Sequence, residues 1–106
     1  MALRWLEVNC RGHIMSVKYE WDARKAVLNL RKHGVSFDDA ATALDDPLSL
    51  TFIDRDHSVS EARYVTLGMS VRGRALVVGH TDRGDAIRII SARLASRAEW
   101  RRYEQS

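Results

Sequence analysis

One segment, Gly84 to Arg93, constrains the fold of this 106-residue chain more than any other. It begins at a turn signal and is rich in isoleucine, a β-branched residue that favours strands. Two further strand-like segments, residues 61–70 and residues 74–81, precede it at short intervals. Because short loops join all three, we predict a meander of antiparallel strands.

Two arginines, Arg88 and Arg93, interrupt this otherwise apolar strand. A buried strand seldom holds a guanidinium unless an anion such as a carboxylate or a phosphate meets it. The two arginines therefore give the first indication of function. The alternative is that they form structural ion pairs with Asp82, Asp85 or Glu99.

The rest of the chain predicts one α+β domain. Alternation and helical periodicity indicate a strand at residues 17–21, helices at 23–33 and 37–44, a strand at 48–53 and a last helix at 96–105. The order is therefore β-α-α-β-β-β-β-α. We expect a two-layer domain with a mainly antiparallel sheet and the helices on one face.

The first helix carries apolar residues at helical spacing, Ala23, Ala26, Val27 and Leu30. This spacing predicts that these four side chains face the core and that Asn29 faces solvent.

The first fourteen residues lie outside this order. They contain no apolar run of the length that a signal peptide or a membrane span requires. Met15 would serve as a natural start for the domain, so we expect residues 1–14 to be a poorly ordered extension and residues 15–106 to form the single domain. The alternative is an extra strand from Leu3 to Val8.

The composition excludes several kinds of site. The chain has no glycine-rich phosphate loop, no dinucleotide fingerprint, no serine in a nucleophile elbow and no metal-binding spacing of histidines. The single Cys10 excludes an internal disulfide and fits a reducing cytoplasm. The formal charge of +3 allows a polyanionic partner. We therefore expect no metal, no cofactor and no membrane.

Loop lengths predict which arginines lie together. A three-residue loop at 71–73 and a two-residue turn at 83–84 would group four arginines in two pairs, one on each face of the sheet: Arg74 beside Arg93, and Arg63 with Arg88 around Gly79 and Thr81. A single bulge would exchange the two groupings.

A small basic sheet with histidine, glutamate and arginine suits the cleavage of RNA by its own 2′-hydroxyl. Glu61 or His57 would remove the 2′ proton, an arginine would stabilise the phosphorane, and a second acid would protonate the leaving 5′ oxygen. The need for a 2′-hydroxyl restricts the substrate to RNA. The plainer alternatives are a solvated His57 and a Glu61 that only pairs with Arg63.

Several motifs resemble the BrnT family of bacterial type II toxins. The most specific are residues 32–37, Lys-His-Gly-Val-Ser-Phe, and residues 87–93, Ile-Arg-Ile-Ile-Ser-Ala-Arg. Further matching positions are Trp21-Asp22, Lys25-Ala26, Asn29, Asp46-Pro47, His57, Glu61 to Arg63, Gly68, Gly73-Arg74, Glu99 and Tyr103. The resemblance covers residues 17–103.

The resemblance implies a RelE-like fold and a ribonuclease that halts translation. It also implies neutralisation by a BrnA-type ribbon-helix-helix antitoxin, in a 2:2 assembly that contacts operator DNA only through the antitoxin. It places Glu61, Arg63 and Arg93 at the active site, with His57 as a further catalytic candidate. For RNA binding we expect Arg74, Arg88, Lys32 and Tyr103. Met69 stands where some family members carry an arginine, so Arg72 or Arg74 would have to supply that cation.

Two other classes of function are compatible with the same residues. The chain could be a degenerate toxin, a non-catalytic binding module that acts only as one half of a DNA-binding repressor complex. It could also be a structural domain whose arginines are all paired internally.

Overall fold

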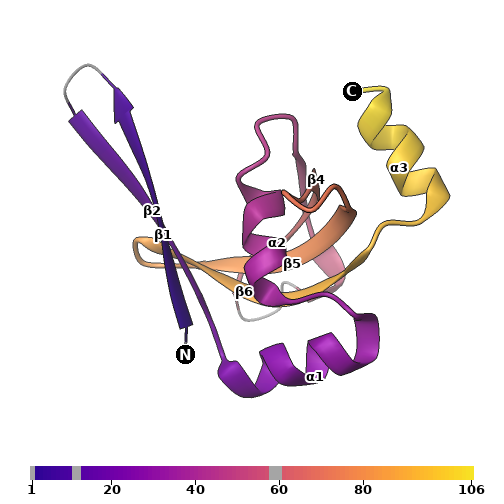
Figure 1. Ribbon diagram of the computed structural model, residues 1–106, viewed down its shortest axis with the longest axis horizontal. Helices are drawn as coiled ribbons and strands as arrows, with labels where there is room; N and C mark the ends of the chain where they lie inside the picture. Colours follow the sequence, from indigo (N-terminus) through magenta and orange to yellow (C-terminus); the bar gives the residue numbers. More distant parts are fainter. Residues whose placement is uncertain (1, 11–12, 58–60) are drawn as a thin grey trace.

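The structure, a computed structural model, describes residues 2–10, 13–57 and 61–106, and for residues 2–10 and 13–17 it describes the backbone only. Its elements, shown in Figure 1, are β1 (Ala2–Cys10), β2 (His13–Trp21), α1 (Ala23–His33), α2 (Phe37–Leu44), β3 (Leu50–Ile53), the 3-10 turn η1 (Arg55–His57), β4 (Arg63–Met69), β5 (Ala75–Arg83), β6 (Ala86–Leu94) and α3 (Arg97–Glu104).

The described strands form one six-stranded sheet in the order β1-β2-β6-β5-β4-β3. Strands β3 to β6 form the predicted meander, each antiparallel to its neighbour. Strand β2 joins the other edge in parallel, through Lys18–Glu20 against Ala86–Arg88. The prediction of an α+β domain with a mainly antiparallel sheet is confirmed.

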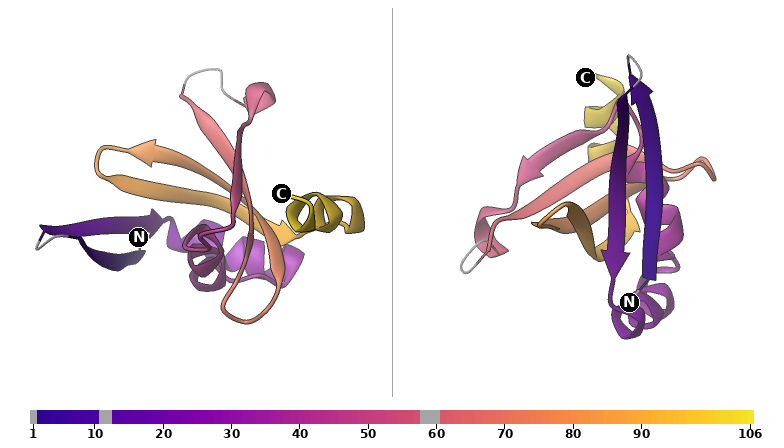
Figure 2. Two further views of the ribbon diagram at one scale, coloured as in Figure 1. Left: turned by 90° about the horizontal axis from the view of Figure 1, so that it is seen from above. Right: turned by 90° about the vertical axis from the view of Figure 1, so that its left-hand side faces the viewer.

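Helices α1 and α2 lie on one side of the sheet and bury the main core (Figure 2). Phe37 of α2 is 1% exposed and packs edge-on against Trp21, with ring centroids 6.1 Å apart. From the sheet, Leu76, Val78 and Ile89 complete this core. Burial of these large side chains is the main source of stability.

Helix α3 does not lie beside the other two helices. It packs by β3 and β4, across these strands from α2 (Figure 2). The Arg102 guanidinium lies 4.5 Å from the ring centroid of Phe52 on β3, and the Tyr103 hydroxyl donates to Asp46 over 2.7 Å. The expectation of helices on one face therefore holds for α1 and α2. The contacts with Phe52 and Asp46 keep α3 away from these two helices.

The helix ends follow the capping signals in the sequence. Asp22 accepts hydrogen bonds from the backbone at the start of α1, and Ser36 does so for α2. Ser96 and Glu99 form a reciprocal capping box at the start of α3. Gly34 ends α1 with φ of +69°, a left-handed conformation that favours glycine.

The orientation of α1 differs from the prediction. Asn29, expected in solvent, is 8% exposed and bonds to Val35 O, Ala92 O and Ala92 N at 2.8–3.1 Å. Val27 and Leu30, expected in the core, are 52% and 51% exposed. The amide satisfies three backbone groups where α1 meets β6, so polar pairing decides which side of the helix is buried.

The described residues of the N-terminal segment are extended, while poor order of residues 1–14 stays a prediction. The structure has the strand of the alternative prediction, and β1 pairs with β2 from Ala2↔Trp21 to Cys10↔His13. Strand β2 accordingly begins at His13 instead of residue 17. Residues 13–16 are extended because antiparallel pairing with β1 supplies partners for their backbone groups. No described helix is long and apolar enough to cross a membrane.

Candidate functional site

The candidate site lies on the sheet face that points away from α1 and α2, called here the open face. Gly68 identifies the two faces, because a Cβ at this position would lie 2.4 Å from the Ala43 carbonyl oxygen of α2. Alternate residues point to opposite sides of a strand. Arg63, Val65 and Leu67 of β4 therefore lie on the open face.

One predicted arginine group is present on this face. Arg63 pairs with Thr81 of β5, and Thr81 pairs with Arg88 of β6. The two guanidinium groups thus start from the same row of the sheet, on either side of a buried threonine. The prediction that they flank Thr81 is confirmed.

The other predicted group, Arg74 beside Arg93, is wrong. The turn before β6 lies at residues 84–85, and a bulge between Gly79 and His80 inserts Ile90 as an extra residue. Arg93 consequently pairs with Val77 on the open face, while Arg74 lies on the helix side. The bulge, which sequence reasoning allowed but could not locate, separates the two side chains.

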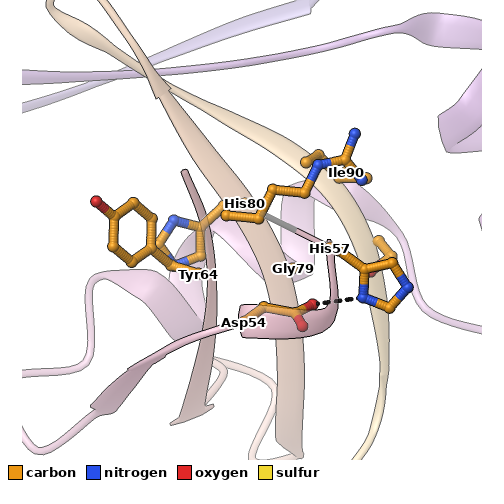
Figure 3. Close-up of a pocket in the computed structure, with 8 residues that line it drawn as sticks. Asp54, His57, Tyr64, Gly79, His80 and Ile90 are labelled. Carbon is orange, nitrogen blue, oxygen red and sulfur yellow. Dashed lines mark hydrogen bonds and ion pairs between the residues drawn. The ribbon is translucent and has the colours of Figure 1, made fainter. Parts of the chain in front are cut away.

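A pocket of about 160 Å³ opens on the open face (Figure 3). Its walls come from η1 and the meander: Asp54, His57, Arg63, Tyr64, Gly79, His80, Ile90 and Ser91. Figure 3 shows the Asp54 and His57 side chains together and the Tyr64 and His80 rings stacked apart from them; both rings extend from the helix side of the sheet. Two of the predicted catalytic residues, His57 and Arg63, therefore share one pocket.

His57 is paired with Asp54. Its Nδ1 lies 2.9 Å from Oδ2 of Asp54, and the pair spans the 3-10 turn. An ionised carboxylate only accepts hydrogen bonds, so it selects the tautomer in which Nδ1 carries the proton and Nε2 carries the lone pair. This arrangement leaves Nε2 able to accept a proton.

Arg63 supplies positive charge to the same pocket. Its guanidinium lies 3.6 Å from Glu61, whose side chain is 44% exposed. Because so exposed an ion pair is weak, a bound phosphate can compete for the guanidinium. Glu61 does not line the pocket, whereas His57 does. The geometry therefore favours His57 over Glu61 as the base.

Arg93 is engaged by a carboxylate, as the ion-pair alternative had it. Two of its guanidinium nitrogens donate to Glu99, over 2.8 and 2.9 Å. These hydrogen bonds hold the pKa of Glu99 at about 2 and raise that of Arg93. The pair joins the end of β6 to the first turn of α3, outside the pocket.

The remaining RNA-binding candidates lie apart from the pocket. Arg74 donates to the buried Asp39 over 2.9 Å. The hydrogen bond from Tyr103 to Asp46 raises the pKa of Tyr103 to about 12. Lys32 is exposed on α1, on the other side of the sheet. Of the four candidates, only Arg88 extends from a strand on the same face of the sheet as Arg63.

His80 forms part of the pocket wall. Its Nε2 lies 2.7 Å from the Thr66 hydroxyl, and burial lowers the pKa of the ring. His80 is thus a neutral, packed side chain. Among the described residues, no group of three or more histidine, cysteine, aspartate or glutamate side chains could hold a metal ion.

Sequence reasoning missed Asp54, Gly79 and Ser91 as pocket residues. The signal for Asp54 was its spacing of three residues from His57. One turn of 3-10 helix brings residues at this spacing into contact. Gly79 and Ser91 are brought together by the pairing of β5 with β6, in a register that the bulge sets.

Comparison with known proteins decides the family. A family model described as the ribonuclease toxin BrnT of type II toxin–antitoxin systems matches residues 21–99. The chain belongs to the BrnT family. The match lies within residues 15–106, the range predicted for the domain. That this range folds without residues 1–14 stays a prediction.

A solved BrnT structure supports the assignment. The 1.1 Å crystal structure of the BrnT ribonuclease toxin of Brucella abortus is similar to this chain, with a TM-score of 0.56 and 26% identity. The similarity covers 73% of this chain and 94% of the Brucella chain. The fold expected from the resemblance is confirmed. No curated protein matches this chain significantly.

Proposed function

We propose that this BrnT-family chain is an endoribonuclease that cuts RNA through its own 2′-hydroxyl group, without a metal ion. The observation that carries the proposal is the pocket that His57, Asp54 and Arg63 share. A base and a cation at one site are the two groups that this reaction needs most.

The proposed reaction uses these groups in turn. Nε2 of His57 removes the proton of the 2′-hydroxyl, and Asp54 orients the ring and stabilises its positive charge. The 2′ oxygen attacks the phosphorus, and Arg63 neutralises the charge that grows on the non-bridging oxygens. The bond to the 5′ oxygen breaks, that oxygen takes a proton from a second acid, and a 2′,3′-cyclic phosphate remains.

Arg88 extends the binding surface. It lies in the same row of the sheet as Arg63, two strands away, and its guanidinium forms no ion pair within the described part of the chain. Because neighbouring phosphates of an RNA strand are several ångströms apart, a second cation in the row can bind the next phosphate. We assign Arg88 to RNA binding, and Arg93, Arg74 and Tyr103 to the framework.

In the cell, such an enzyme would halt translation in the cytoplasm by destroying RNA. Membership of a type II family implies an antitoxin partner, and we propose a BrnA-type ribbon-helix-helix protein in a 2:2 complex that contacts operator DNA through the antitoxin. The family description supports this proposal, and no residue of α1, α2 or α3 lines the pocket.

Growth in bacteria tests the proposal. Induction of the wild-type chain should stop growth, and His57→Ala or Arg63→Ala should relieve the arrest at equal protein levels. Purified wild-type protein that binds an antitoxin yet leaves RNA intact would contradict catalysis and support a non-catalytic binding module.

A further inference from the structure

A serine hydroxyl lies in the pocket next to the proposed catalytic groups. Ser91 lines the pocket with His57 and Arg63, and its side chain is exposed. Within residues 13–57 and 61–106, no hydrogen bond engages its hydroxyl. The hydroxyl is therefore available to a ligand.

The residue opposite Ser91 leaves room for this hydroxyl. Gly79 pairs with Ser91 across β5 and β6, and a Cβ at position 79 would lie 2.7 Å from Oγ of Ser91. Alanine at position 79 would therefore drive the hydroxyl into another rotamer. This rotation costs little, because the side chain is short and exposed, so its effect falls on function more than on stability.

The bulge explains why Ser91 points into the pocket. Ile90 of β6 has no partner on β5, because Gly79 pairs with Ser91 and His80 pairs with Ile89. This extra residue reverses the alternation along β6. Ile89 therefore points into the helix-side core, while Ser91 points to the open face. Bulges often re-aim a side chain at a functional site in this way.

We propose that Oγ–H of Ser91 donates a hydrogen bond to a non-bridging oxygen of the scissile phosphodiester, and that Gly79 is its positioning residue. The inference rests on the proposed function, because it takes the pocket as the seat of that phosphate. Neutral donors that are aimed at developing negative charge stabilise the transition state beside a cation such as Arg63.

A double-mutant cycle on RNA cleavage by the full chain tests this inference. Ser91→Ala should lower kcat about 10²-fold with little change in KM, since one transition-state donor is lost. Gly79→Ala should lower kcat similarly, while the double variant should be no worse than Ser91→Ala. Ser91→Thr, which keeps the hydroxyl, should recover most of the activity, and Ser106→Ala, beyond the end of α3, is the control.

The outcomes separate the inference from the proposed function. Full activity of Ser91→Ala, with activity lost in His57→Ala and Arg63→Ala, would overturn the role of Ser91 alone. Multiplying losses in the double variant would overturn the positioning role of Gly79. Full activity of all these variants would instead overturn the proposed site.

A second, independent observation concerns the outer surface of α1. Val27, Leu28 and Leu30 are 52%, 56% and 51% exposed, although their spacing resembles that of a buried stripe. Exposed cations lie along one edge of this surface, beside Val27 and around Leu28: Arg24, Lys25, Arg31 and Lys32. The helix contains no aspartate or glutamate. The fold therefore leaves an apolar surface with a cationic border uncovered.

We infer that this surface binds an acidic amphipathic segment of a protein and, within the proposed function, a segment of the antitoxin. The exposed aliphatic side chains favour a protein over RNA, since RNA offers few apolar groups to them. The cationic border favours acidic residues on the partner. The surface is on the other side of the sheet from the pocket, so it contributes affinity without touching the catalytic groups.

Calorimetric titration with a BrnA-type ribbon-helix-helix antitoxin tests the surface. The double variant Val27→Glu/Leu30→Glu should raise Kd about 100-fold while it cleaves RNA at the wild-type rate. Val71→Glu changes an equally apolar side chain, 80% exposed in a hairpin loop, and should bind normally.

Each other outcome has a definite meaning. Normal binding by the double variant would overturn the surface and leave the antitoxin proposal standing. Absence of binding by the wild-type chain would overturn the antitoxin proposal itself, and the surface with it. A wild-type dimer that the double variant converts to a monomer would overturn the antitoxin as occupant, in favour of a second copy.

Discussion

His57 and Asp54 form a hydrogen-bonded pair, Nδ1 to Oδ2 over 2.9 Å, at the mouth of a pocket that also holds Arg63. One turn of 3-10 helix brings the two residues together. A carboxylate in this position selects the ring tautomer that can act as a base, which ties the local geometry to the proposed chemistry.

Asp54→Asn should lower the rate of RNA cleavage about 10²- to 10⁴-fold, the range of general base catalysis. An amide can donate to Nδ1 and so favour the tautomer whose Nε2 is protonated. Steady-state cleavage of a single-stranded RNA measures the effect. Asp56→Asn, an exposed neighbour in the same turn, is the matched control, and an equal loss in both variants would contradict the role of Asp54.

Arg63→Lys should retain part of the activity, and Arg63→Ala should lose about 10²- to 10³-fold in kcat, because lysine keeps the charge without the planar fork. The matched control is Arg101→Ala, an exposed arginine of α3. Wild-type kcat for Arg63→Ala would remove Arg63 from the mechanism.

Arg93→Ala should weaken folding more than catalysis. Loss of the bidentate ion pair should lower the free energy of unfolding by about 1–2 kcal/mol, and folded protein should still cleave RNA. A large loss of cleavage in fully folded Arg93→Ala would return Arg93 to the active site.

The same ion pair makes stability depend on pH. The pKa of Glu99 is about 2 in the folded protein against 4.5 ordinarily, chiefly through hydrogen bonds from Arg93. Its contribution is therefore complete above about pH 4.5 and is lost as the pH falls towards 2. Urea unfolding between pH 7 and pH 2.5 should show a shallower acid dependence in Arg93→Ala than in wild type.

The sequence predicted the local signals and missed those that depend on long-range pairing. The caps at Asp22, Ser36 and Ser96 follow from residue type alone, because each hydroxyl or carboxylate bonds to a nearby backbone N–H. The strand order of the meander follows from short loops. The bulge of β6 opposite Gly79 cannot be predicted from loop length, because it depends on how the side chains of β5 and β6 pack on the core.

Asn29 shows the same limit within a helix. Periodicity placed it in solvent, yet it bonds to backbone groups of Val35 and Ala92, the latter 63 residues away. A distant polar partner cannot be read from spacing. The catalytic assignment of Arg93 came from the family pattern, and its ion pair with Glu99 was one of the alternatives that the charges allowed.

Asn29→Ala should lower the free energy of unfolding by about 2–4 kcal/mol, because the buried backbone groups of Val35 and Ala92 lose their partners. Lys25→Ala, at an exposed site on the same helix, should change it by less than about 0.5 kcal/mol. Urea denaturation of both variants measures the difference. Equal stabilities would mean that the amide is not what holds α1 in this orientation.

The most direct test of the account is the cleavage of one RNA oligonucleotide in the presence of EDTA, compared with the same oligonucleotide carrying a single 2′-deoxy nucleotide at the cut site. We predict that the wild-type protein cuts the first to a 2′,3′-cyclic phosphate and a 5′-hydroxyl and leaves the second intact at that position. Cleavage of the 2′-deoxy position at an undiminished rate, or loss of all cleavage in EDTA, would contradict the account.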